Sequence, residues 1–282
     1  MDKTKSYSIS KHAVKEAYDR VKRNGGTSGV DGESIEMFEK DLKNNLYKIW
    51  NRMSSGSYQP KAVREVGIPK SDGGERKLGI PTVTDRVAQM VTKLYLEPEL
   101  EKVFHEDSYG YRPNKSAHDA IGRAREKCRR YDWVIDLDIK GFFDNINHEK
   151  LMKALDKHCK HNWVMLYAER WLKMEVETSE GERKKRDRGT PQGGVISPLF
   201  SNLYLHYTFD RWIQITHPQN PFERYSDDII IHCQSKEQAE NRLQSIRERL
   251  KQCDLELNEE KTKIVYCKND NRWKRSNEHE KF

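Results

Sequence analysis

Two neighbouring carboxylates, Asp227 and Asp228, lie between short stretches of apolar, aromatic and β-branched residues. Residues 222–225 precede them and residues 229–233 follow, a pattern that predicts two short strands joined by a tight turn. Acidic residues are also common in turns that perform no chemistry, so this stretch alone is more typical of a solvated hairpin. A second acidic strand earlier in the chain favours the chemical interpretation.

That earlier strand covers residues 133–140 and alternates between apolar and charged side chains, with Asp136 and Asp138 on the charged face. From there onward the expected order is strand, helix, insertion, strand, strand, helix, strand. This order is the split βαβ arrangement of ferredoxin-like folds. Its first and third strands are neighbours, so we expect Asp138 to lie close to Asp227 and Asp228.

Three carboxylates gathered at one point of a sheet repel one another, and divalent cations relieve that repulsion. Magnesium suits such a site because it takes oxygen ligands and retains some of its water. Two Mg²⁺ ions about 3.5–4 Å apart activate a hydroxyl and stabilise a leaving pyrophosphate during in-line displacement. We therefore predict that Asp138, Asp227 and Asp228 are catalytic metal ligands for phosphoryl chemistry.

A basic hairpin offers candidate ligands for phosphate groups. Residues 63–81 contain two extended segments around a glycine-rich turn, and Lys70 and Arg76 are expected near one end of the ribbon. Such cations can bind a triphosphate, although a solvated hairpin is the alternative interpretation. Residues 116–130 form a basic helix that is either a solvated face or a wall for a nucleic-acid backbone.

The chain has 282 residues, enough for one large domain or two smaller ones. Its 52 Lys and Arg against 45 Asp and Glu give a net charge of +7, which is typical of a protein with a polyanionic partner such as nucleic acid, and a mildly basic soluble protein without such a partner is the alternative. The five cysteines are scattered, which fits a reducing compartment. No apolar run approaches the roughly 18 residues of a membrane span, so we expect a cytoplasmic protein without a membrane partner.

The remaining apolar periodicity predicts the other elements. Helices are expected at residues 10–23, 33–51, 116–130, 148–158 and 163–171. Three more helices are expected to begin at Thr84, at Ser197 with Pro198, and after a capping box at residues 235–238. A closing strand is expected at residues 261–267.

Several segments carry a resemblance to a known family. Residues 138–146, 190–198 and 225–228 resemble three successive motifs of reverse transcriptases. More narrowly, the chain resembles the reverse transcriptase/maturase encoded by bacterial group II introns, whose further motifs match residues 29–32, 68–70, 76–81, 109–113 and 260–262. The likeness spans about residues 10–267, and the order and spacing of the motifs make it specific.

The resemblance implies an α+β fold of right-hand polymerase fingers and palm. Fingers with an N-terminal extension are expected at residues 1–125, and a palm at 126–282, interrupted by a return to the fingers at about 146–190. The palm would be the ferredoxin-like split βαβ antiparallel sheet, with helices on one face. The family continues into a thumb and later domains, so we expect a fragment truncated before the thumb, with weak or absent processive synthesis and a possible homodimer through exposed apolar surface.

The resemblance also implies roles for individual residues. Asp138 and Asp227 are expected to be the main metal ligands, with Asp228 completing the cluster and the Ile139 carbonyl reaching a metal. Phe143 matches the aromatic gate against a ribose 2′-hydroxyl, although a core aromatic is the alternative. The other expected nucleotide-binding residues are Gln192, Lys70 and Arg76, while Arg112 matches a family position without an assigned role. The family more often carries alanine where Ser226 stands.

The function implied is an RNA-directed DNA polymerase that also binds its group II intron RNA as a splicing maturase. Its expected partners are the intron RNA, an RNA template with a DNA primer, dNTPs and two Mg²⁺ ions. One alternative is an RNA-binding maturase whose polymerase centre is silent. Another is a reverse transcriptase from a retron, a diversity-generating element or a CRISPR-linked gene. An RNA-dependent RNA polymerase is disfavoured by Phe143, since an acid usually occupies that place in such enzymes.

Overall fold

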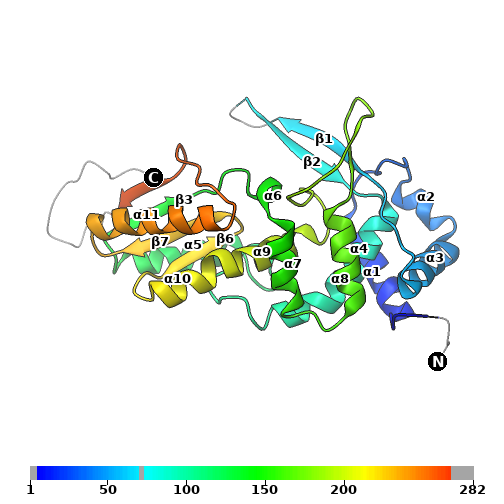
Figure 1. Ribbon diagram of the computed structural model, residues 1–282, viewed down its shortest axis with the longest axis horizontal. Coiled ribbons are helices and arrows are strands. Elements are labelled where there is room, and N and C mark those ends of the chain that lie inside the picture. Colours follow the sequence, from blue (N-terminus) through cyan, green and yellow to red (C-terminus); the bar gives the residue numbers. More distant parts are fainter. Residues whose placement is uncertain (1–4, 70–72, 268–282) are drawn as a thin grey trace. The chain divides into compact units, whose positions relative to one another are not determined.

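Two units make up the chain (Figure 1). The computed structural model describes residues 5–69 and 73–267. Unit 1 comprises Met1–Lys102 and His148–Phe200, and unit 2 comprises Val103–Asn147 and Ser201–Phe282. The chain therefore leaves unit 1, returns to it and leaves it again. The assignment of fingers and palm to residues 1–125 and 126–282, with a return at 146–190, stays a prediction.

Unit 1 is largely helical. Its helices are α1 (Lys11–Asn24), α2 (Ile35–Glu39), α3 (Leu42–Ser55), α4 (Val83–Leu100), α7 (His148–Asp156) and α8 (Asn162–Leu172), and α1 packs against α3 and α4. The Ser10 hydroxyl caps α1, as the sequence predicts. The strongly apolar face of α4 supplies Val87, Ala88 and Val91, none of which is exposed to solvent.

Two helix predictions for unit 1 are wrong in detail. The single helix expected at residues 33–51 is broken between α2 and α3, because Asp41 leaves the helical conformation, with φ −127° and ψ 41°. The Asn45 side chain donates to the Phe38 carbonyl at 3.0 Å and so satisfies an acceptor at the break. Helix α4 is capped by Thr82 rather than begun by Thr84, since the Thr82 hydroxyl accepts from the Asp85 amide at 3.0 Å.

The predicted hairpin at residues 63–81 is confirmed. Strand β1 (Val63–Pro69) pairs with β2 (Glu75–Ile80) in antiparallel register, and Ile68 lies opposite Arg76. Short strands β4 (Val176–Glu177) and β5 (Arg183–Lys184) extend the sheet in the order β2-β1-β4-β5. The expected phosphate ligand Lys70 lies outside the described residues.

Unit 2 contains the predicted split βαβ sheet. Its strands are β3 (Trp133–Leu137), β6 (Phe222–Tyr225), β7 (Asp228–Cys233) and β8 (Lys263–Tyr266), in the order β6-β7-β3-β8. Every neighbouring pair is antiparallel, and the first and third strands in chain order, β3 and β7, are adjacent at the centre. Helix α11 (Lys236–Gln252) packs against β3, β7 and β8 (Figure 1).

Shorter elements complete unit 2. They are α5 (Ala117–Cys128), which contacts β6 and β7, α6 (Phe142–Asn145), the π-helical turn η1 (His206–Asp210) and α10 (Arg211–Thr216). Helix α9 (Ser197–Leu205) begins at the predicted Ser197 and runs directly into η1. Buried apolar side chains of β3 and β7, among them Ile135, Leu137 and Ile231, form the centre of the core. No helix in the described ranges has both the length and the apolar character needed to cross a membrane.

Candidate active site

Strand pairing brings the two acidic segments together. In the β3–β7 ladder, Asp136 pairs with Ile230 and Leu137 with Ile229. One further step in the same register places Asp138 opposite Asp228, because antiparallel partners advance in opposite directions. Asp227 lies in the turn that precedes β7, so all three predicted acids lie at one end of this strand pair.

The acids influence one another electrostatically. Burial, followed by the nearby charges of Asp227 and Asp138, raises the pKa of Asp228. Lys261, in one of the motif segments, provides partial compensation, with its Nζ 3.5 Å from Asp138 Oδ2. Burial and the neighbouring carboxylates make the charged form of Asp228 unfavourable, and a bound cation would relieve that cost.

The acids do not form a closed metal cage. Among residues 5–69 and 73–267, no group of three or more His, Cys, Asp or Glu side chains is arranged to hold a metal ion by itself. Magnesium in nucleotide-processing sites is usually bound by one or two carboxylates, with substrate phosphates and water supplying the other oxygens. The donor set of Asp138, Asp227 and Asp228 is of that open kind.

The Ile139 carbonyl is oriented by the neighbouring backbone. Ile139 forms an isolated antiparallel bridge with Leu257, flanked by hydrogen bonds from the Lys140 amide to the Glu256 carbonyl and from the Asn258 amide to the Asp138 carbonyl, each 2.9 Å. In such a pair the amide and carbonyl of Ile139 point away from the bridging strand. The carbonyl is therefore directed toward the β7 side, where the acidic turn lies.

Phe143 lies in α6, five residues beyond Asp138. Gly141, at φ 55°, turns the chain from the strand into this short helix. Phe143 is 7% exposed and packs edge-to-face on Phe142, with ring centroids 5.4 Å apart. Both interpretations of this residue, gate and core aromatic, stay predictions.

In unit 1 the structure joins two of the predicted nucleotide-binding residues. Arg76 Nε of β2 donates to Gln192 Oε1 at 2.8 Å, and the Gly79 amide donates to the Gln192 carbonyl at 2.7 Å. Gly193 has φ +113°, and a Cβ there would come 3.1 Å from the Gly79 carbonyl oxygen. Close approach of the glycine-rich loop to β2 therefore depends on the missing side chain. The sequence predicted both residues but not their contact.

The chain is similar to known reverse transcriptases and intron-encoded proteins. The model of the family "Reverse transcriptase (RNA-dependent DNA polymerase)" matches residues 68–280. The chain belongs to this family. Protein YkfC of Escherichia coli is 34% identical over 280 residues, which cover 85% of this chain and 72% of YkfC. Group II intron-encoded protein LtrA of Lactococcus lactis is 31% identical over 252 residues, covering 88% of this chain but 40% of LtrA.

A solved structure shares the fold. The telomerase of Candida albicans, in complex with a fragment of telomeric RNA, aligns with a TM-score of 0.57 at 14% identity, covering 85% of this chain and 46% of the telomerase chain. The predicted α+β fold of a reverse transcriptase is confirmed, and the split βαβ sheet of unit 2 is antiparallel as predicted. The resemblance to group II intron-encoded reverse transcriptases is confirmed as well.

Arg112 of this reverse transcriptase-family chain organises its own loop. Its Nη1 donates to the carbonyls of His105 and Ser108, at 2.6 and 2.8 Å, and its guanidinium lies 5.4 Å from the centroid of the Phe104 ring. These contacts fix the segment that precedes α5. The sequence matched this position to the family without giving it a role, and the structure gives it a structural one.

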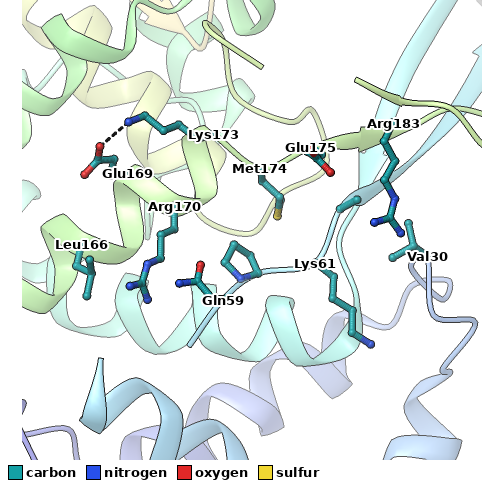
Figure 2. Close-up of a pocket in the computed structure, with 12 residues that line it drawn as sticks. Val30, Gln59, Lys61, Leu166, Glu169, Arg170, Lys173, Met174, Glu175 and Arg183 are labelled. Atoms are coloured by element: carbon teal, nitrogen blue, oxygen red, sulfur yellow. Dashed lines mark hydrogen bonds and ion pairs between the residues drawn. The ribbon is translucent and has the colours of Figure 1, made fainter. Parts of the chain in front are cut away.

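Unit 1 also contains a cavity of about 580 Å³, lined by residues of α8, the segment 59–62 and neighbouring loops (Figure 2). Its cationic side chains already have partners. Lys61 contacts Asp31, Lys173 contacts Glu169, Arg183 contacts Glu177, and Arg170 Nη1 donates to the Gly56 carbonyl. Because binding a phosphate here would compete with these contacts, we do not assign the chemistry to this cavity.

Sequence reasoning missed three buried polar residues next to the acidic turn: Asn202, Asp210 and Arg224. Arg224 stands beside Glu223 in β6, and these two charged residues between Phe222 and Tyr225 were the available signal. A charged side chain is rarely fully buried unless it is paired. The partners, however, come from α9 and η1, whose geometry the sequence does not reveal.

Proposed function

We propose that the chain is an RNA-directed DNA polymerase that transfers nucleotides from dNTPs to a primer 3′-hydroxyl and that also binds group II intron RNA as a splicing maturase. The observation that supports this most is the register of β3 and β7, which brings Asp138 to the Asp227–Asp228 turn in a chain of the reverse transcriptase family.

The acidic residues have defined roles in this proposal. Asp138, Asp227, Asp228 and the Ile139 carbonyl would hold two Mg²⁺ ions. Bound magnesium supplies charge neutralisation and lowers the pKa of an attacking hydroxyl. Lys261 partly compensates the negative charge of the carboxylates, since its ammonium lies beside Asp138.

The nucleotide is assigned to a second set of residues. Arg76 and Lys70 would bind the triphosphate, because a guanidinium can hold two phosphate oxygens and an ammonium acts as a point charge. The Arg76–Gln192 hydrogen bond orients the guanidinium before substrate arrives. Phe143 would exclude a ribose 2′-hydroxyl by occupying the space that it needs.

RNA binding rests on charge and on relatives. The net charge of +7 favours a polyanionic partner. Relatives include LtrA, named as a group II intron-encoded protein, and nuclear intron maturases of Arabidopsis thaliana. The proposed partners are therefore intron RNA and an RNA template carrying a DNA primer.

The decisive experiment separates synthesis from splicing. Asp138→Asn removes one carboxylate charge with little change in shape, so primer extension on an RNA template should fall to background while splicing of the cognate intron continues. Persistence of both activities would show that the metal assignment is wrong. The comparison is made in the full-length protein, where splicing by a wild type that never extends a primer would instead identify a silent maturase.

A further inference from the structure

A buried ion pair lies next to the acidic turn of unit 2. Arg224 and Asp210 both have side chains that are 0% exposed. Their contact is bidentate, with Nε 2.6 Å from Oδ1 and Nη2 2.6 Å from Oδ2. The remaining guanidinium nitrogen, Nη1, donates to Asn202 Oδ1 and to the carbonyl of Ser226, each at 3.0 Å.

This cluster connects segments that are far apart in the sequence. Asp210 ends the π-helical turn η1, Asn202 belongs to α9, and Arg224 belongs to β6. The Asn202 amide also donates to the Gly110 carbonyl at 2.7 Å. A Cβ on Gly110 would come 2.4 Å from the Ser226 amide nitrogen, so this loop lies directly against the turn.

Stability alone is a poor explanation for such a pair. Removing two charges from water carries a large desolvation cost, and apolar replacements of buried pairs are often neutral or stabilising. Single π-helical turns within helices frequently occur at functional sites. We therefore infer that the cluster is present because it fixes the geometry of the neighbouring backbone.

The geometry imposed is that of the turn. Tyr225 pairs with Asp228, which leaves Ser226 and Asp227 as a two-residue connection. Ser226 has φ 60°, a left-handed conformation that is unfavourable for an L-residue. Such strain persists only where the surroundings hold it. Arg224 supplies one such restraint through its hydrogen bond to the Ser226 carbonyl.

We propose that Arg224, anchored by Asp210 and Asn202, is a positioning residue that fixes the Ser226 peptide and so directs the Asp227 carboxylate to the metal site. This inference rests on the proposed polymerase function. Arginine is required because only its planar fork reaches Asp210 and the Ser226 carbonyl at once, whereas lysine presents one nitrogen.

Arg224→Lys in the full chain tests the proposal. We expect the Mg²⁺ concentration for half-maximal single-nucleotide incorporation to rise about tenfold, because the Asp227 carboxylate is no longer held toward the metal. A tenfold change corresponds to about 1.4 kcal/mol of metal-binding free energy. The control is Leu250→Ala, which removes a buried side chain of α11. If Leu250→Ala loses as much thermal stability as Arg224→Lys, its Mg²⁺ midpoint should still lie within about twofold of the wild-type value. An unchanged midpoint in Arg224→Lys, or an equal shift in both variants, would overturn the proposal.

A second measurement does not depend on polymerase activity. Mn²⁺ binding, followed by the paramagnetic resonance signal of free Mn²⁺, should weaken by a similar factor in Arg224→Lys. If wild type binds Mn²⁺ in this way but makes no DNA, the polymerase proposal fails while the positioning role stands. Absence of Mn²⁺ binding by the wild type, both without and with a dNTP whose phosphates complete the open site, would refute both.

A milder variant covers the case in which Arg224→Lys does not fold. Asn202→Ala keeps the Arg224–Asp210 pair but removes one acceptor of Nη1 and the hydrogen bond to Gly110. We expect a shift of the Mn²⁺ midpoint in the same direction and of smaller size, about threefold. A folded Asn202→Ala protein with the wild-type midpoint would contradict the proposal.

Discussion

Ser226 combines a left-handed backbone with a buried hydroxyl that has no hydrogen-bond partner among the described residues. An unsatisfied buried hydroxyl costs roughly 1–3 kcal/mol. We therefore predict that Ser226→Ala raises the free energy of unfolding by about 1 kcal/mol and leaves the Mg²⁺ midpoint of nucleotide incorporation unchanged. Urea denaturation and primer extension provide the two readouts.

Ser226→Val is the matched contrast. A β-branched side chain is strongly disfavoured at positive φ, so this variant should lose stability while Ser226→Ala gains it. Equal stability of the two variants would show that the left-handed turn is not retained in solution.

Asp85 gives a prediction about pH. Burial raises the pKa of this carboxyl to about 6, although it accepts hydrogen bonds from the hydroxyls of Tyr58 and Thr82. Because the folded-state pKa exceeds the unfolded value, the associated stability is fully present below about pH 4 and is lost as the pH rises through 6. Urea denaturation of wild type should show a decrease of about 2–3 kcal/mol from this group between pH 4 and 7.

Asp85→Asn should abolish that part of the pH dependence, whatever its effect on absolute stability. The comparison is therefore between the slopes of the two curves. If the unfolding free energies of wild type and Asp85→Asn run parallel from pH 4 to 7, the carboxyl does not titrate as its burial requires.

At the scale of elements, the loop that carries Gly110 lies against the turn after β6, and this close contact is possible because Gly110 has no side chain. Gly110→Ala would place a Cβ 2.4 Å from the Ser226 amide nitrogen, so the acidic turn must move. We expect at least a tenfold loss of nucleotide incorporation at saturating dNTP, with a raised Mg²⁺ midpoint. Quench-flow kinetics across a Mg²⁺ titration measures both quantities.

Gly122 provides the matched control for this substitution. It lies within α5, and an added Cβ meets nothing within 4 Å among the described residues. Gly122→Ala should therefore stabilise the protein by about 0.5–1 kcal/mol through helix propensity and leave catalysis unchanged. If Gly122→Ala lost as much activity as Gly110→Ala, the effect of Gly110→Ala could not be assigned to a clash with the acidic turn.

The elements differ in how well the sequence predicts them. Alternation at residues 133–140 and the β-branched run at 229–233 predicted two strands, and the split βαβ order was sufficient to place β3 beside β7. The break at Asp41 was not predictable from apolar periodicity, which continues across it. The π-helical turn η1 was missed for a related reason, since its residues are compatible with an ordinary helix and only the tertiary pairing of Asp210 distinguishes them.

The candidate site was predicted unevenly as well. The positions of the acids followed from strand order, whereas the Arg76–Gln192 contact joins residues 116 positions apart that no local pattern connects. Local rules describe neighbours along the chain or within one ladder, so side-chain contacts between separate loops and strands lie beyond them.

At the scale of the whole molecule, the net charge of +7 predicts how RNA binding responds to salt. Each phosphate contact releases condensed counterions, so the logarithm of affinity should fall linearly with the logarithm of salt concentration. Between 50 and 200 mM KCl we expect the affinity for intron RNA to decrease by at least about tenfold. Filter binding over this range is the measurement, and an affinity independent of salt would contradict electrostatic binding.

The chain path through the two units bears on how the protein is made. Strand β3 leaves the ribosome long before β7 and β8, which flank it in the finished sheet. During that interval some ninety residues are synthesised, at about 5–20 residues per second. For several seconds β3 therefore lacks its strand partners, and side chains that are buried in the finished fold stay exposed: Val134, Ile135 and Leu137. This interval is when a nascent chain of this topology most needs a chaperone.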